Sequence, residues 1–168
     1  ESLSREAAER LQALSVLQAT LESTAEGVLV VDRSGSITQW NANFARMWGI
    51  PPAVLAEGKD DFALAFVLEQ LEEPQTFLAK VQELYATPEA ESRDDLYFKD
   101  GRVFERYSRP QRVGERIVGR VWSFLDVTMR RKVEAALRRA VCDLERSNKD
   151  LEQFAYAAAL EGVMVRDR

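Results

Sequence analysis

Residues 100–128 read DGRVFERYSRPQRVGERIVGRVWSFLDVT and predict two β-strands, over residues 102–112 and 116–127. Asp100-Gly101, just before them, is a strong hairpin signal because Asp and Gly tolerate the positive φ of a tight turn. Val113-Gly114-Glu115 predicts the turn between the two strands. The last strand is apolar on both faces, which is typical of a central strand covered on both sides.

The segments before this region predict the rest of the sheet and its cover. Gly27-Val-Leu-Val-Val-Asp32 and residues 37–40 predict a second hairpin. Residues 41–87 carry helical patterns that begin at Asn41, a good N-cap, and a further strand ends at Lys99. Two strands, a cluster of helices and three strands predict an α+β fold, with helices on one face of a five-stranded antiparallel sheet.

Long helices are predicted on both sides of this domain. We divide the chain into an amphipathic helix over residues 1–22, the domain over 23–128, a helix over 129–160 and a short strand over 161–168. The leucines of the first helix fit two interpretations, a helix that covers its own domain or one half of a dimer seam. In the second helix, Leu137, Leu144 and Leu151 recur every seven residues and predict a parallel coiled-coil dimer, the alternative being a helix packed back on the sheet.

The last eight residues repeat an earlier segment. EGVMVRDR at residues 161–168 matches EGVLVVDR at residues 26–33 at six of eight positions. Because each copy follows an amphipathic helix, we interpret the second as the first strand of a further domain of the same kind. The alternative is chance similarity between two apolar strands.

Taken in their order and spacing, the motifs resemble a PAS sensor domain followed by its C-terminal signalling helix. The resemblance covers about residues 18–135 and rests on residues 26–32, 37–41 with Phe44 and Gly49, 100–104 and 119–128. It implies the sheet order 2-1-5-4-3, ligands held between sheet and helices, and a bacterial multi-domain signalling protein as the parent.

The resemblance also implies that Asp126-Val127-Thr128 couples the last strand to the output helix. A carboxylate at such a junction can accept hydrogen bonds from exposed backbone N–H groups and favours the positive helix N-terminus. Thr128 is a candidate N-cap. An ordinary cap without a signalling role is the alternative, and we expect Asp126 and Thr128 to couple strand and helix.

Candidate pocket residues are the aromatic side chains of the helices and strands together with one arginine. They are Phe44, Trp48, Phe62, Phe66, Phe77, Arg106, Tyr107, Trp122 and Phe124. Arg106 or Arg120 would bring a charge into the pocket if its face pointed inward, where a buried arginine needs an anionic partner. The favoured interpretation is that both arginines face solvent.

Composition excludes several chemistries. The 168 residues include 23 Lys and Arg, 28 Asp and Glu and no His, for a net charge of −5. Without histidine there is no His-ligated haem, no His-based catalysis and no phospho-accepting histidine. Cys142, the single cysteine, lies outside residues 41–87, where light-sensing flavin members carry theirs. A non-covalent flavin or a small organic ligand remains open, and we expect no metal site.

We therefore expect a cytoplasmic, non-enzymatic module without nucleic-acid or membrane contacts. Residues 144–156 resemble the lead-in to a histidine-kinase dimerisation helix, but Ala157-Ala-Ala-Leu-Glu161 follows in place of the expected Ser-His-Asp-Leu. Two hypotheses share the same scaffold. The first is a sensor that binds a small ligand and signals through a homodimer of its terminal helices to a covalently linked output domain, as in two-component kinases or nucleotide cyclases. The second is a ligand-free dimerising relay with a filled core.

Overall fold

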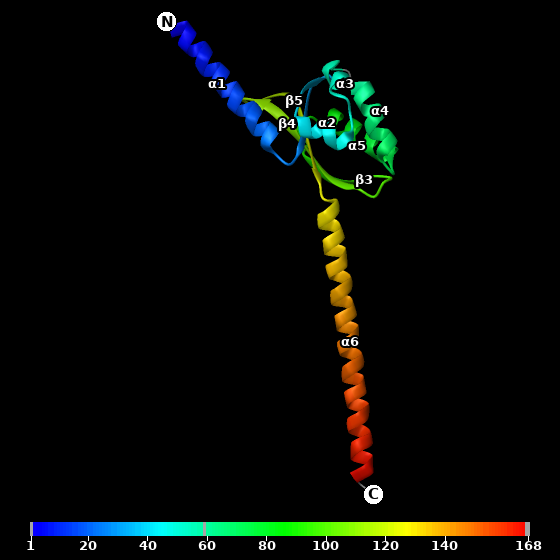
Figure 1. The fold of residues 1–168 in the computed structure, drawn as a ribbon. Helices are drawn as coiled ribbons and strands as arrows, with labels where there is room; N and C mark the ends of the chain where they lie inside the picture. The colour runs from blue at the N-terminus through cyan, green and yellow to red at the C-terminus, as the bar shows by residue number, and fades with distance from the viewer. Residues whose placement is uncertain (1, 59, 167–168) are drawn as a thin grey trace. The chain divides into compact units, whose positions relative to one another are not determined.

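The computed structural model describes residues 2–58 and 60–166. The chain forms two compact units, one up to Thr128 and one from Met129 onward. The first unit begins with helix α1 (Ser2–Ser23) and continues into a sheet with shorter helices, most of which are labelled in Figure 1. The second consists of a single long helix, α6.

The sheet has the predicted topology. Its strands are β1 (Gly27–Asp32), β2 (Ile37–Trp40), β3 (Ser92–Tyr97), β4 (Val103–Val113) and β5 (Arg116–Asp126). They lie in the order β2-β1-β5-β4-β3, and every neighbouring pair is antiparallel. Strand β5 is therefore central, as its apolar faces predict, and β3 lies at an edge.

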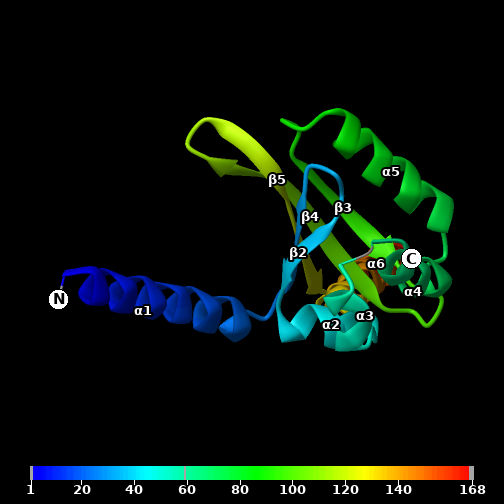
Figure 2. The same cartoon turned by 90° about the horizontal axis from the view of Figure 1, so that it is seen from above.

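Four helices connect the two hairpins and cover one side of the sheet (Figure 2). They are α2 (Ala42–Trp48), α3 (Pro52–Ala56), α4 (Asp60–Gln70) and α5 (Pro74–Ala86). The predicted N-cap of α2 is confirmed, since Asn41 Oδ1 accepts from the backbone N–H of Phe44 at 3.0 Å. The same oxygen accepts from Val28 at 2.9 Å, which fixes the start of α2 against β1. Gly49 ends the helix with a φ of 63°, a left-handed conformation that glycine adopts without strain.

The core between sheet and helices is strongly aromatic. The Trp48 ring lies 5.1 Å from Phe98, 5.5 Å from Phe104 and 5.2 Å from Phe124 between centroids. The contacts with Phe104 and Phe124 are edge-to-face, the arrangement that the charge distribution of aromatic rings favours. This cluster ties α2 to β4, to β5 and to Phe98, which directly follows β3.

Helix α6 (Thr128–Arg166) continues beyond its predicted end. Residues 161–166 are helical, so the predicted strand over residues 161–168 is wrong for them, and residues 167–168 lie outside the described residues. A lone strand would leave its backbone groups without partners, whereas a continued helix bonds its own. That the repeated sequence marks the start of a further domain of the same kind stays a prediction. Within the described residues, no helix combines the length and the apolar character that a membrane span needs.

Candidate ligand chamber and coupling site

A cavity of about 40 Å³, here called the aromatic chamber, lies between the sheet and helices α4 and α5. Its walls are mainly apolar and combine three helices with two central strands. The lining residues are Leu29, Phe44, Ala63, Leu64, Val67, Phe77, Val81, Tyr85, Trp122 and Phe124. A cavity of this size accommodates a few water-sized groups.

Four of the predicted pocket residues line the aromatic chamber, namely Phe44, Phe77, Trp122 and Phe124. Trp122 and Phe124 face the helices from β5, and each is almost fully buried. Trp48 is also buried, but it belongs to the aromatic cluster with Phe98 and Phe104 and does not line the chamber. The chamber is therefore smaller than the predicted pocket.

Phe62 and Phe66 were predicted in the pocket, and this is wrong. Their side chains are 55% and 37% exposed. Helix α4 instead buries Ala63 and Val67, which lie one turn apart on the face that contacts the core. The neighbouring phenylalanines follow a different face of the same helix.

The two arginines contradict the favoured interpretation that both face solvent. Arg106 is 1% exposed and Arg120 is 3% exposed. Because successive strand residues point to opposite faces, Tyr107 cannot share the inner face with Arg106. Tyr107 is half-buried, and its ring lies 5.3 Å from the guanidinium carbon of Arg93. Its prediction as a pocket residue is therefore wrong.

Arg106 is paired across the strands with Asp94. Its Nε donates to Asp94 Oδ1 at 2.9 Å, and its Nη2 donates to Oδ2 at 2.5 Å. The guanidinium carbon lies 4.5 Å from the Phe77 ring centroid and 5.5 Å from that of Trp122. The third nitrogen, Nη1, is buried and has no acceptor within the described residues.

Arg120 binds the chain around the C-terminal end of α5. Its Nη1 donates to the carbonyl of Ala90 and to the Ser108 hydroxyl, both at 2.9 Å. Its Nη2 donates to three further backbone carbonyls, those of Leu84, Thr87 and Pro88. Burial lowers the pKa of Arg120 from its ordinary value. The carbonyl dipoles stabilise the buried charge and fix α5 against β5.

The predicted coupling residues meet at the start of α6. Asp126 Oδ1 accepts from the Thr128 backbone N–H at 2.9 Å and from its hydroxyl at 2.5 Å. Thr128 Oγ1 in turn accepts from the Val103 N–H at 3.0 Å, and the Val127 N–H donates to the Val103 carbonyl at 2.9 Å. The first residue of α6 is thus held by both β4 and β5.

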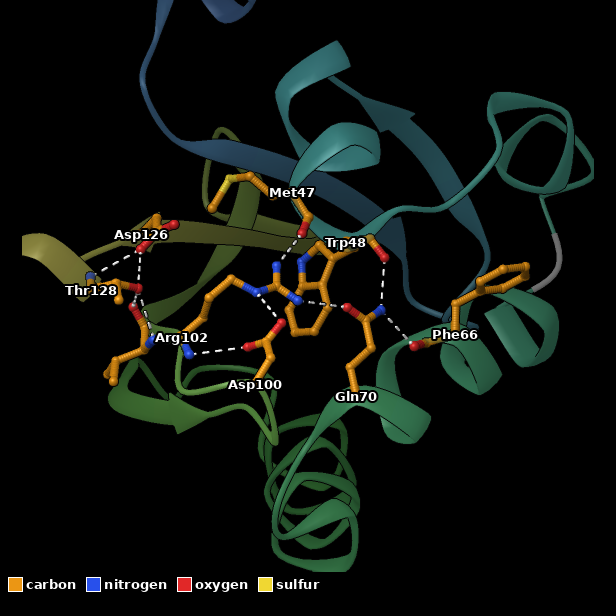
Figure 3. A network of polar contacts seen from close by, with 9 residues as sticks. Met47, Trp48, Phe66, Gln70, Asp100, Arg102, Asp126 and Thr128 are labelled. Carbon is orange, nitrogen blue, oxygen red and sulfur yellow. Dashed lines mark hydrogen bonds and ion pairs between the residues drawn. The ribbon is translucent and has the colours of Figure 1, made fainter.

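Next to Val103, Arg102 connects this junction to the helices, as Figure 3 shows. Its Nη1 donates to the Met47 carbonyl at 2.9 Å and its Nη2 to Gln70 Oε1 at 3.0 Å. Gln70 Nε2 donates to the Trp48 carbonyl at 2.7 Å. The sequence analysis missed Arg102 and Gln70, because no local pattern joins residues that lie 32 positions apart.

The described residues offer no group of three His, Cys, Asp or Glu side chains arranged to hold a metal ion.

Comparison with known proteins gives a family and a fold. A family model described as PAS fold matches residues 21–135. The PAS domain of an HTR-like protein from Haloarcula marismortui is 18% identical with a TM-score of 0.54, over 73% of this chain and 98% of that one. The PAS domain from Bordetella pertussis BvgS is 17% identical with a TM-score of 0.52, over 81% of this chain and 98% of that one. Such low identities show the fold alone, and no curated protein matches the chain.

Proposed function

The chain belongs to the PAS family, and from this membership we propose that it acts as a sensory module in signal transduction. Its core senses a small ligand, and the state of the core reaches α6 through the Asp126–Thr128 junction. From α6 the state passes to an output domain of kinase or cyclase type in the parent protein. The module carries no catalysis of its own.

One observation carries this proposal, namely that the junction holds the start of α6 to two strands at once. Thr128 Oγ1 bonds to Val103 on β4 and to Asp126 at the end of β5. Trp122 and Phe124, on β5, line the aromatic chamber. A shift of β5 against β4 therefore changes the geometry that starts the helix, and a ligand produces such a shift only if it binds two arrangements with different affinity.

The small size of the aromatic chamber favours a compact ligand over a flavin. Pockets for drug-sized ligands have volumes of roughly 300–1,000 Å³, whereas this chamber has about 40 Å³. A flavin would enter only if α4 and α5 moved away from the sheet. The same observation supports the second candidate, a relay with a filled core that passes on a signal without binding a ligand.

A homodimer is the second part of the proposal. Leu137, Leu144 and Leu151 are each more than 60% exposed along α6, and Leu11, Leu14 and Leu17 are similarly exposed on α1. Leucines repeated every seven residues form the seam of two-stranded coiled coils. A second copy of this chain supplies a matching stripe, so that α6 helices pair in parallel.

Mass spectrometry of the purified chain, first native and then denaturing, with an absorbance spectrum of the same sample, tests both parts. A small molecule released on denaturation supports the sensor, and visible absorbance would point to a flavin instead of a compact ligand. A dimer without bound molecule favours the relay. A monomer contradicts the coiled-coil dimer.

A further inference from the structure

A second cavity, here called the arginine cavity, has a volume of about 60 Å³ and is lined by the turn after β1, the C-terminal end of α5 and strand β5. A space of this size admits a small group of atoms. It shares only Tyr85 with the aromatic chamber, so the two are separate spaces. Its charged lining residues are Asp32, Arg33 and Arg120, and its apolar ones include Leu84, Pro88 and Ile117.

Arg120 has one guanidinium nitrogen that the protein does not use. Nη1 and Nη2 donate to four backbone carbonyls and to the Ser108 hydroxyl, whereas Nε has no acceptor among the described residues. In that part of the chain, the enclosed donors without a partner are Trp48 Nε1 and Arg106 Nη1. Arg120 Nε is not one of them and therefore borders open space, which the cavity that Arg120 lines supplies.

The positive charge of Arg120 has no carboxylate beside it, although the side chain is almost fully buried. Its acceptors are neutral carbonyl and hydroxyl oxygens, whose dipoles stabilise the charge but do not balance it. Buried charges in proteins are normally paired with an opposite charge. Glu89 and Glu91, in the segment after α5, are exposed and do not line the cavity.

The lining of the arginine cavity carries an excess of positive charge. Arg33 adds a second cation, and Asp32 is the acidic residue among the described lining residues. Asp32 Oδ1 is already occupied in the β1–β2 turn, where it accepts from the Ser34 N–H, the Ser34 hydroxyl and the Ser36 N–H. Two positive charges and one negative charge leave an excess of one, which a single monovalent anion neutralises.

The apolar lining determines what kind of anion fits. Leu84, Pro88 and Ile117 offer contact to an alkyl group, and burying such a group is favourable. A phosphate or sulfate has no apolar part, and its second negative charge would exceed the charge of the lining. A carboxylate on a short alkyl chain matches both the charge and the apolar surface.

We propose that the arginine cavity binds a short-chain carboxylate, whose oxygen accepts a hydrogen bond from Arg120 Nε and whose alkyl part lies against Leu84, Pro88 and Ile117. Arg33 attracts the same carboxylate from the turn after β1. The bound ligand connects this turn, the end of α5 and β5. The inference goes beyond the proposed sensory function, because neither the aromatic chamber nor the Asp126–Thr128 junction takes part in it.

NMR titration of the full wild-type chain with three probes tests the inference. Propionate carries the charge and the alkyl group, propionamide has the same shape without the charge, and inorganic phosphate carries charge without the alkyl group. The readouts are the Nε–H resonance of Arg120 and the methyl groups of Leu84 and Ile117, at constant ionic strength. The Nε–H of Arg106, which is bonded to Asp94, is the internal control.

We expect propionate to shift the Arg120 Nε–H resonance in a saturable way, to leave that of Arg106 unchanged, and to bind about tenfold tighter than propionamide. Equal affinities of propionate and propionamide, or tighter binding of phosphate, overturn the proposal. So does a titration without a saturable shift at Arg120, Leu84 or Ile117. Shifts confined to Leu64 and Val81 would place the probe in the aromatic chamber and also overturn it.

A pair of variants tests the site without removing Arg120. Arg33→Gln removes the second cation of the lining, and we expect it to weaken propionate binding about threefold. Arg116→Gln is the matched control, because Arg116 is equally an exposed arginine and does not line the cavity. Both variants change the net charge of the chain by the same amount. Equal losses in the two variants would show that propionate responds to net charge alone and overturn the site.

Discussion

The Oγ1 atom of Thr128 lies 3.0 Å from the backbone nitrogen of Val103, so the first residue of α6 is hydrogen-bonded to β4. The same hydroxyl donates to Asp126, the last residue of β5. One side chain thus holds together two strands and the start of a helix. Since a hydroxyl can donate and accept at once, threonine suits this position and an isosteric apolar residue does not.

Thr128→Val should therefore loosen the junction while the domain stays folded. Valine keeps the shape of the side chain and removes both hydrogen bonds of the hydroxyl. We expect a loss of about 1–2 kcal/mol in stability and faster hydrogen exchange at Val103 and in the first turn of α6. Hydrogen exchange with mass spectrometry measures this, and equal loss of protection throughout the core would contradict it. Asp126→Ala should act in the same direction.

Arg102→Met should weaken the connection between the helices and the junction. The substitution removes hydrogen bonds to Met47, Gln70 and Asp100 and leaves an apolar side chain against Phe98. We expect faster exchange in α2 and in the hairpin between β3 and β4. Lys99→Met is the matched control. Lys99 lies in the same hairpin, and the substitution removes its exposed hydrogen bond to the Glu69 carbonyl. Similar effects of both variants would show that Arg102 has no special role.

The two buried arginines, Arg106 and Arg120, show which side-chain positions a sequence pattern does not predict. Alternation along β4 and β5 places Arg106 and Arg120 on the inner face of the sheet. Their charge favoured exposure to solvent instead, and the expectation based on charge was wrong. A signal for Arg106 was present. A hairpin centred on Asp100-Gly101 would pair residue 95 with residue 106, and the observed register pairs residue 94 with it instead. Both residues are aspartates, so either register sets a carboxylate opposite the guanidinium.

No comparable signal existed for Arg120. Its partners are mainly backbone carbonyls near the end of α5, and any residue type supplies those. By contrast, turn and cap residues act locally, which is why the Asn41 cap and the Asp100-Gly101 turn were predicted correctly. The size of the aromatic chamber depends on how side chains from five elements fit together, which no pattern along the chain encodes.

Arg120→Met should destabilise the domain strongly. It leaves several buried carbonyls with one partner fewer, and each unsatisfied buried group costs about 1–3 kcal/mol. We expect a loss of about 3 kcal/mol in urea unfolding, a smaller loss for Arg120→Lys, and a change within about 0.5 kcal/mol for the exposed Arg109→Met. A loss for Arg120→Met no larger than that of Arg109→Met would mean that its hydrogen bonds do not stabilise α5 against the sheet.

Leu144→Lys should separate the proposed dimer. A charged residue in the middle of a coiled-coil seam opposes burial of the stripe, whereas Glu145→Lys changes a neighbouring position outside it. We expect sedimentation to give a dimer for the wild type and for Glu145→Lys, and mainly monomer for Leu144→Lys. Helicity of α6 should fall together with dimerisation, because no described residue of α6 beyond Thr128 is buried in the single chain. If Leu144→Lys and Glu145→Lys reduced the dimer fraction equally, the dimer seam would not pass through Leu144.

The turn between β1 and β2 should make stability depend on acid pH. The Ser34 hydroxyl, together with the backbone N–H groups of Ser36, Ser34 and Gly35, holds the pKa of Asp32 below its ordinary value of 3.8, against a weaker effect of burial. A carboxyl group whose pKa is lower in the folded state stabilises the fold above its unfolded pKa, and this contribution is lost as pH falls through the folded pKa.

Asp32→Asn keeps an oxygen acceptor but does not titrate. The stability difference between wild type and Asp32→Asn, measured by urea unfolding from pH 7 to pH 2.5, should therefore be constant above about pH 5 and shrink below about pH 4. A difference that stays constant to pH 2.5 would show that the ionised carboxylate of Asp32 does not stabilise the turn.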